Sequence, residues 1–386
     1  MGFTVNQIAA PVSADKREVI EKARRLCGIS PDKIKSADIH KTSLDARKRS
    51  NIHFVHSVYF ELADPAEEQR LCAKKGFCRM ADEPAQPNFS DIKREGRTVV
   101  AGFGPAGMFC ALTLARYGYR PLVLEKGAEV DKRTQKVEAF WSGGELDENS
   151  NVQFGEGGAG TFSDGKLTTR IKDPLCRSIL QDFARFGADS SILAKAKPHI
   201  GTDVLKTVVK NIRREIIALG GEICFETPLT GITMRGGEIW SVKSARGEER
   251  CAALVVACGH SARETFRLLD NSGIIMQPKP FSVGVRIEHR QTAVNESLYG
   301  VHAGNPLLPV GEYQLSHRNA EGRGVYTFCM CPGGTVVAAA SEHGGVVTNG
   351  MSEFARNGEN ANAAVAVSVT PHPPPPSAVF SRASRR

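Results

Sequence analysis

The sequence predicts an α/β fold with a Rossmann-like parallel sheet in its central part. Three observations predict this class. An apolar strand at 97–101 runs directly into the glycine-rich turn at 102–107, a second glycine-rich stretch follows at 151–166, and another apolar strand at 252–257 ends beside glycine. Strands that alternate with helices and end in such turns are typical of sheets that bind ligands at their carboxyl ends. The predicted divisions are a small α/β domain with its linker (1–90), the Rossmann-like domain (91–274), a partial β-rich substrate or cap domain (275–370) and a disordered proline-rich basic tail (371–386).

Each glycine of the first turn has its own role in binding a pyrophosphate. Gly102 permits a tight turn, Gly104 lets the backbone approach the phosphates, and Gly107 allows the next helix to pack close to the strand. The residues up to Gly118 carry an apolar helical face, and the N-terminus of this helix would face the anion.

A second short strand at 121–124 ends in Glu125, 23 positions after Gly102. An acid at this place accepts hydrogen bonds from an adenosine ribose and repels a 2′-phosphate. A lone glycine motif would be weak, since the chain has 38 glycines and an ordinary βαβ unit is the alternative. The complete unit of strand, turn, helix, strand and acid predicts a dinucleotide site.

Composition excludes several classes of protein. The longest apolar stretches are far shorter than the roughly 18 residues that a membrane span needs. The net charge of +8 is spread out, and residues 1–50 hold 11 basic against 6 acidic residues without interleaved aromatics, which favours a solvated basic face over a nucleic-acid-binding module. Ten scattered cysteines and the lack of an apolar leader segment favour a reducing, cytoplasmic location.

The N-terminal segment predicts a small α/β unit. Ser13 is placed to cap a helix with an apolar face of Val19, Ile20, Ala23 and Leu26, which ends at Gly28. Alternation over 52–60 predicts a strand, on which His56 is expected as a core histidine with its hydrogen bonds satisfied rather than as a ligand. Residues 81–91 are expected to form a linker.

Further elements complete the predicted central domain. The loop at 151–166 holds five glycines, which favours close approach to a cofactor ring or pyrophosphate over an ordinary irregular loop. An amphipathic helix is predicted at 204–219, followed by strands at 223–225 and 229–232 and a buried strand at 252–257.

These segments resemble the glutathione-reductase-like class of FAD proteins, and more specifically the bacterial FAD-dependent, or NAD(FAD)-utilising, dehydrogenases. The resemblance covers roughly residues 1–370. It implies an FAD-dependent oxidoreductase that transfers a hydride or electron pair between flavin and an unidentified small molecule, with NAD(P)H as a candidate electron donor. The motifs that carry it are Val99–Gly107, Leu124–Gly127, Ser150–Leu167, Gly259–Arg263, Phe281–Arg286 and Cys329–Gly334.

The expected cofactor contacts follow from these motifs. Arg133 is expected either to pair with a phosphate or to lie on the surface. The residues expected to bind FAD are Gly102, Gly104, Pro105, Ala106, Gly107, Glu125, Lys126, Arg133, Gly157, Gly158, Ala159, Gly160, Thr161, Leu229 and Gly259.

Two residues are expected to act in catalysis, although a structural role is open for each. Lys166 would stabilise negative charge on a reduced flavin, and His260 would act as an acid or base. Cys329 and Cys331 could be metal ligands, a strained disulfide or a redox pair, and thiols without metal are favoured because no second ligand pair has zinc spacing. No metal site is predicted.

The resemblance has one clear departure. Family members are usually longer and return to the FAD domain with a Gly-Asp at a strand end, whereas this chain has no Gly-Asp dipeptide and changes abruptly to a proline-rich sequence after Thr370. We therefore expect a C-terminally truncated chain, and a disabled flavin-binding fragment is the alternative to a working enzyme. A polyproline ligand for a partner is a weaker alternative for the tail.

Overall fold

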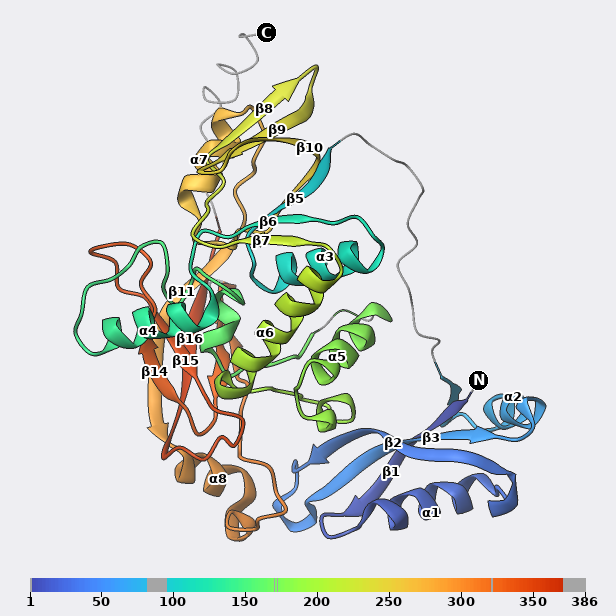
Figure 1. Ribbon diagram of the computed structural model, residues 1–386. Coiled ribbons are helices and arrows are strands. Elements are labelled where there is room, and N and C mark those ends of the chain that lie inside the picture. The colour runs from blue at the N-terminus through green and yellow to red at the C-terminus, as the bar shows by residue number, and fades with distance from the viewer. Residues whose placement is uncertain (1, 82–95, 170, 172, 321, 371–386) are drawn as a thin grey trace.

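The computed structural model describes residues 2–81, 96–169, 171, 173–320 and 322–370. Its described residues form a four-stranded N-terminal sheet, a six-stranded central sheet, a four-stranded C-terminal sheet and a two-stranded ribbon (Figure 1). The predicted tail and the predicted linker, apart from Ala81, lie outside the described residues. Five short 3₁₀ helices join these elements: Pro31–Lys33, Arg49–Asn51, Gly158–Phe162, Ser190–Leu193 and Gly300–His302.

The N-terminal unit packs two helices on an antiparallel sheet with strand order β2-β3-β1-β4. Its core holds buried apolar side chains from β1, α1 and β3, with Phe3 stacked on Phe60 at 5.9 Å between ring centroids. Its elements are β1 (Phe3–Pro11), α1 (Lys16–Cys27), β2 (Ile34–Asp45), β3 (His53–Leu62), α2 (Pro65–Lys74) and β4 (Cys78–Met80).

Two details of this unit differ from the sequence-based expectation, and a third agrees. Asp15, not Ser13, caps α1, because its carboxylate accepts from the Glu18 amide while Glu18 reaches back in a capping box. Leu26 is 48% exposed and lies outside the core. His56 is buried with Nδ1 2.9 Å from the Thr42 hydroxyl, which confirms a core histidine with a satisfied partner.

The central sheet has the order β7-β6-β5-β10-β9-β8. Its first four strands are mutually parallel, and the order 3-2-1-4 that they form along the chain is the Rossmann arrangement. The strands are β5 (Arg97–Ala101), β6 (Leu122–Leu124), β7 (Glu222–Cys224), β8 (Gly231–Arg235), β9 (Glu238–Ser244) and β10 (Gly247–Val256). The predicted fold class is therefore confirmed.

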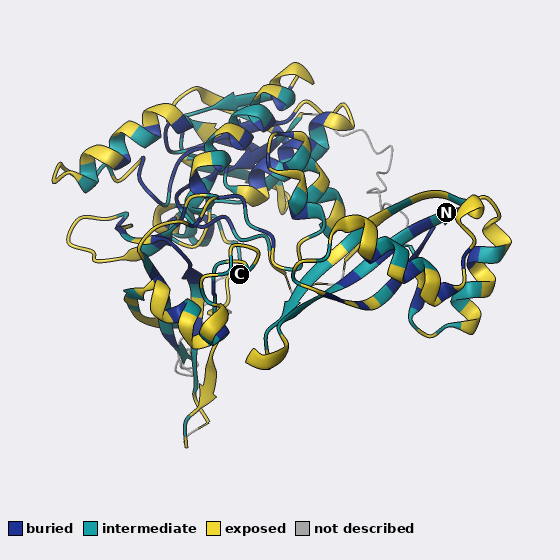
Figure 2. Ribbon diagram, turned by 90° about the horizontal axis from the view of Figure 1, so that it is seen from below, coloured by how far each residue is buried: buried dark blue, intermediate teal, exposed yellow. Residues whose placement is uncertain are grey.

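Helices α3 (Pro105–Arg116) and α6 (Thr202–Ala218) pack on each other beside this sheet and enclose the largest apolar core (Figure 1). The crossover from β6 to β7 also contains α4 (Val130–Trp141) and α5 (Leu175–Arg185), and α7 (Arg263–Asn271) follows β10. Figure 2 shows the buried residues concentrated inside this layer and the exposed ones along its outer helices.

Two predicted apolar faces are less buried than their sequence patterns indicate. Ile217 is 52% exposed at the outer side of α6. The strand at 252–257, predicted to be buried, has no buried residue: Ala253 and Val256 are exposed, Val256 to 38%, and the other four are partly buried. A run of apolar residues indicates a strand but cannot show which parts of its two faces other elements cover.

The C-terminal sheet has the antiparallel order β11-β16-β13-β12. A bulge interrupts the pairing of β13 between Phe328 and Cys331, where Cys329 has a φ of 47°. The elements are β11 (Phe281–Arg290), α8 (Gln291–Tyr299), β12 (Ser316–Arg318), β13 (Gly324–Cys331), β14 (Thr335–Ala338), β15 (Thr348–Met351) and β16 (Asn360–Val369).

Candidate functional site

The glycine turn follows β5, at the point where the strand order of the central sheet reverses between β5 and β10. Gly102 has a φ of 103°, and its amide donates to the Leu124 carbonyl at 2.8 Å. A Cβ at Gly102 would overlap the carbonyl of Ala257, and a Cβ at Gly107 would collide with the carbonyl oxygen of Gly102. The two glycines are therefore required by the close approach of backbone to backbone.

The start of α3 is open to a ligand. Gly104 is its N-cap, no side chain caps it, and Pro105 and Ala106 at the first positions are exposed. The first amides of a helix have no acceptor within the helix, and its N-terminus carries partial positive charge. This unblocked helix start fits the pyrophosphate of FAD, which Gly104 and the residues up to Gly107 would bind.

Glu125 ends β6 and is 5% exposed beside the turn. Its Oε2 accepts from the Phe103 amide at 2.6 Å, and its Oε1 accepts from the amides of Gly127 and Gly155 at 2.8 and 3.0 Å. The position agrees with a ribose-binding acid at the end of the second strand. Three backbone partners leave a lone pair on Oε2 for a ribose hydroxyl, and that role stays a prediction.

The second glycine-rich segment packs directly on the first. The Gly157 amide donates to the Phe103 carbonyl at 2.9 Å, and a Cβ on Gly104 would lie 3.7 Å from the Gly158 Cα. Pro105 also faces this loop, with its Cγ 3.7 Å from a Cβ built on Gly160. The structure thus brings the loop residues Gly157 to Thr161 to the glycine turn. Thr161 itself is buried, and its hydroxyl donates to the Glu156 carbonyl at 3.1 Å.

Arg133 lies where neither expectation placed it. Its side chain is fully buried, and its guanidinium donates to the carbonyls of Asn151, Glu156, Val152 and Gly158 at 2.6 to 3.0 Å. Burial lowers its pKa to about 10, against the opposing effect of two nearby carboxylates, Glu125 and Glu156. The surface alternative is wrong, and the donors expected to pair with a phosphate instead hold the glycine-rich loop in place.

The remaining predicted cofactor residues lie around the same strand ends. Lys126 pairs with Glu264 at 3.1 Å, Leu229 packs against an apolar cluster contributed by several strands of the central sheet, and Gly259 is exposed with a φ of 75°. His260 is exposed, with Nε2 3.2 Å from the Ser261 hydroxyl. Their contacts with a cofactor remain predictions.

Lys166 belongs to a charged cluster that the sequence did not indicate. Its Nζ lies 2.7 Å from the carboxylate of Asp164, which is fully buried and also receives a bidentate hydrogen bond from Arg356. Burial acts to raise the pKa of Asp164, but the hydrogen bonds from Arg356 and the charges of Arg356 and Lys166 outweigh it and lower the pKa. Asp164 thus stays ionised and holds the Lys166 amine, which is 3.8 Å from Glu312.

Cys329 and Cys331 lie in the bulge of β13 beside this cluster. The Cys331 thiol donates to the Cys329 carbonyl at 3.4 Å, and Arg286 on β11 donates to the same oxygen at 3.1 Å. A hydrogen bond from Cys331 lowers the pKa of Cys329 against the effect of burial, aided by the charges of Arg286 and Lys166. Among the described residues no group of three His, Cys, Asp or Glu side chains is arranged to hold a metal ion.

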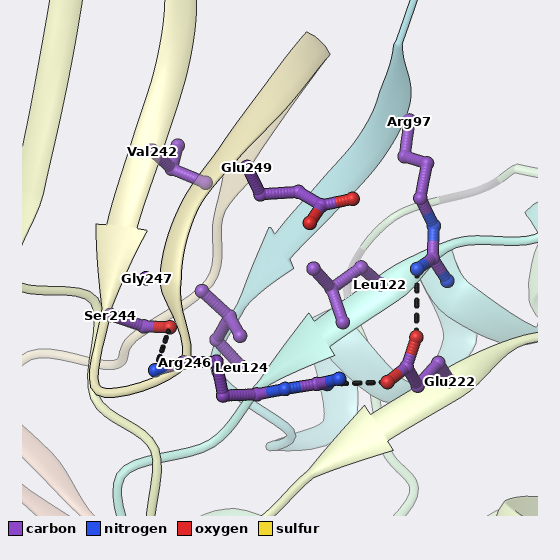
Figure 3. Close-up of a pocket in the computed structure, with 9 residues that line it drawn as sticks. All are labelled: Arg97, Leu122, Leu124, Glu222, Val242, Ser244, Arg246, Gly247 and Glu249. Carbon is purple, nitrogen blue, oxygen red and sulfur yellow. Dashed lines mark hydrogen bonds and ion pairs between the residues drawn. The ribbon is translucent and has the colours of Figure 1, made fainter.

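Two cavities in the described part of the chain lie away from the turn. One of about 30 Å³, room for about one water molecule, is lined by Arg97 and Arg246, which both bind Glu222, and by their neighbours in the sheet (Figure 3). A larger open hollow of about 550 Å³ is lined by Phe140, Glu145, Leu146, Ala340 and residues 342–345. Neither includes a residue of the glycine turn.

Strand order, turn and helix start together define a Rossmann-like nucleotide-binding protein. An uncharacterized protein of Clostridium beijerinckii (strain ATCC 51743 / NCIMB 8052) is 44% identical over 376 residues, which cover 94% of this chain and 69% of that protein. The chain belongs to the same family as this protein.

Two family models match parts of the chain. Residues 280–382 match the family described as FAD-dependent protein, C-terminal domain-like, and residues 4–61 match Domain of unknown function (DUF8436). The first match confirms the expected cofactor, FAD.

Solved structures show more distant similarity. Glycine oxidase from Bacillus cereus ATCC 14579 is 13% identical, with a TM-score of 0.35 over 74% of this chain and 76% of that chain. OxyS anhydrotetracycline hydroxylase from Streptomyces rimosus is 19% identical, with a TM-score of 0.31 over 74% of this chain and 48% of that chain. Within the described residues no helix is both long and apolar enough to cross a bilayer.

Proposed function

We propose that this chain binds FAD across the glycine turn and the start of α3, and that it transfers a hydride or electron pair between the flavin and a small molecule. The observation that carries the proposal is the packing of the 151–162 loop on the turn, with the Gly157 amide bonded to the Phe103 carbonyl. The backbone of two glycine-rich segments is thereby held beside one unblocked helix N-terminus, which suits an extended anionic cofactor.

FAD would supply the redox chemistry, and the chain's residues would bind it and adjust its charge. Gly102 to Gly107 would hold the pyrophosphate, and Glu125 would accept from the ribose through its remaining lone pair. Lys166 would stabilise negative charge near the flavin ring, since Asp164 holds its amine in one position. His260 is exposed, so a small-molecule substrate could reach its imidazole.

The visible absorption spectrum of the purified chain tests the proposal first. Stoichiometric FAD that bleaches on anaerobic addition of NADH or NADPH supports a working dehydrogenase with a nicotinamide donor. Bound FAD that no donor reduces supports the alternative, a disabled flavin-binding fragment. A colourless protein that takes up no added FAD contradicts the proposal.

Substitution of Lys166 tests its role. We expect Lys166→Met to lower the flavin reduction potential, because a reduced, anionic flavin would lose a nearby cation. The matched control is Lys197→Met, since Lys197 is 67% exposed and also pairs with Glu312, at 2.6 Å. An unchanged potential and turnover in Lys166→Met would remove this residue from the site.

A further inference from the structure

We propose that Cys329 and Cys331 form a redox-active dithiol, in which Cys329 is the attacking thiol and Cys331 is the resolving thiol that closes a reversible disulfide. The proposal goes beyond flavin chemistry and does not require bound FAD. It rests on the bulge of β13, on the different exposure of the two thiols and on the charged groups around them.

The bulge brings the two thiols together. In a regular strand, residues i and i+2 lie roughly 6.6 Å apart, near the upper limit for a disulfide. Here the pairing of β13 shifts between Phe328 and Cys331, and Cys329 takes a φ of 47°, so these two residues depart from regular strand geometry. The Cys331 sulfur consequently lies 3.4 Å from the carbonyl oxygen of Cys329 itself.

The two thiols differ in exposure and are suited to different roles. Cys329 is partly exposed, so a small disulfide can reach it, whereas Cys331 is fully buried. The hydrogen bond with Cys329 and burial raise the pKa of Cys331, which therefore keeps its proton until it attacks. An attacking thiol must ionise readily, while a resolving thiol needs only proximity.

Three charged groups, Arg286, Lys166 and Asp164, act on the pair. Arg286 of β11 contributes a guanidinium whose Nη1 donates to the Cys329 carbonyl and to Asn362 Oδ1, while its buried Nε has no partner within the described structure. Lys166 adds a second positive charge, and Asp164 adds an opposing negative one. The net effect favours a thiolate at Cys329.

The chemistry needs one external oxidant, a low-molecular-weight disulfide. The Cys329 thiolate attacks one sulfur of this disulfide, whose S–S bond breaks, and the first external thiol leaves as a thiolate. The Cys331 sulfur then attacks the Cys329 sulfur and expels the second external thiol, which takes the Cys331 proton. Two protein sulfurs are oxidised to one disulfide, and one external disulfide is reduced to two thiols.

Mass spectrometry after thiol capture tests the proposal on the full chain. The protein is incubated with glutathione at graded ratios of oxidised to reduced form, alkylated and digested with trypsin. Cleavage after Arg323 and Arg356 gives a peptide with Cys329 and Cys331 as its only cysteines. We expect this peptide to appear two hydrogens lighter in wild type, and as a glutathione adduct on Cys329 in Cys331→Ser.

A control variant and a charge variant sharpen the test. Cys176→Ser, on α5, should leave both products unchanged. Arg286→Gln should slow alkylation of Cys329 about fivefold at pH 6, as expected for a one-unit rise in a thiol pKa near that pH. Wild-type protein in which both thiols stay reduced, or in which only the Cys329 adduct forms, would overturn the proposal whether or not the variants fold.

Discussion

Removal of the Arg133 guanidinium should strongly destabilise the central domain. In Arg133→Met, three buried carbonyl oxygens and the partly buried one of Gly158 lose their donor, and the buried carboxylates of Glu125 and Glu156 lose a neighbouring cation. An unpaired buried acceptor costs about 1–3 kcal/mol, but neighbouring losses are not additive. Breaking a buried charge network typically costs about 3–5 kcal/mol, so we expect a loss of about 4 kcal/mol.

Urea unfolding followed by tryptophan fluorescence measures this loss. Trp141 reports on the region, because its ring packs edge-on against Phe162, on which the Arg133 guanidinium also lies, 4.9 Å from the ring centroid. Arg177→Met, at an exposed position of α5, is the matched control and should change stability by less than about 0.5 kcal/mol. An Arg133→Met protein within about 1 kcal/mol of wild type would refute the reasoning.

Three further predictions concern the turn, a buried carboxylate and a surface ion pair. Gly107→Ala should abolish FAD uptake, since its Cβ collides with the Gly102 carbonyl. The control Gly76→Ala should not, because a Cβ there meets nothing within 4 Å. Equal FAD uptake by both variants would contradict the close-packing argument. Asp164→Asn should lose about 3 kcal/mol at neutral pH. Because its pKa is lowered in the folded protein, the ionised Asp164 stabilises the fold above about pH 4, and this stabilisation is lost as pH falls through the folded pKa. The difference in urea midpoint between wild type and Asp164→Asn should therefore disappear in acid. A difference that stays constant with pH would count against the ion pairs. Arg246→Ala should change the thermal midpoint little, because the ion pair with Glu222 is roughly half exposed. A loss of more than about 1 kcal/mol in the free energy of unfolding would contradict this expectation.

Local patterns predicted the glycine turn and its flanking strands. The role of Gly107 follows from its close approach to the Gly102 carbonyl within the same βαβ motif, whereas the carbonyl that crowds Gly102 belongs to Ala257, far along the chain. Glu125 was placed correctly at a strand end, but its partner Gly155 comes from a loop 30 positions later. No short-range pattern carries that information.

Arg133 and Asp164 show why the rest could not be predicted. Arg133 lies in a helix whose sequence pattern predicts an ordinary solvated charge at this position. Only the fold of the 151–158 loop surrounds its guanidinium with carbonyl groups. Asp164 meets Arg356 across 192 positions, and Cys329 meets Arg286 across 43. Such contacts depend on how the sheets pack, so periodicity and spacing do not indicate them.

The three amide bonds of Glu125 have a consequence for the kinetics of cofactor capture. They join the turn, the end of β6 and the glycine-rich loop through one buried carboxylate, using only atoms of the chain. The receiving backbone is thus ordered before any ligand arrives, and little chain entropy remains to be lost on association. Association should accordingly be a single fast step, and the amides of Phe103, Gly127 and Gly155 should resist hydrogen exchange in the cofactor-free protein.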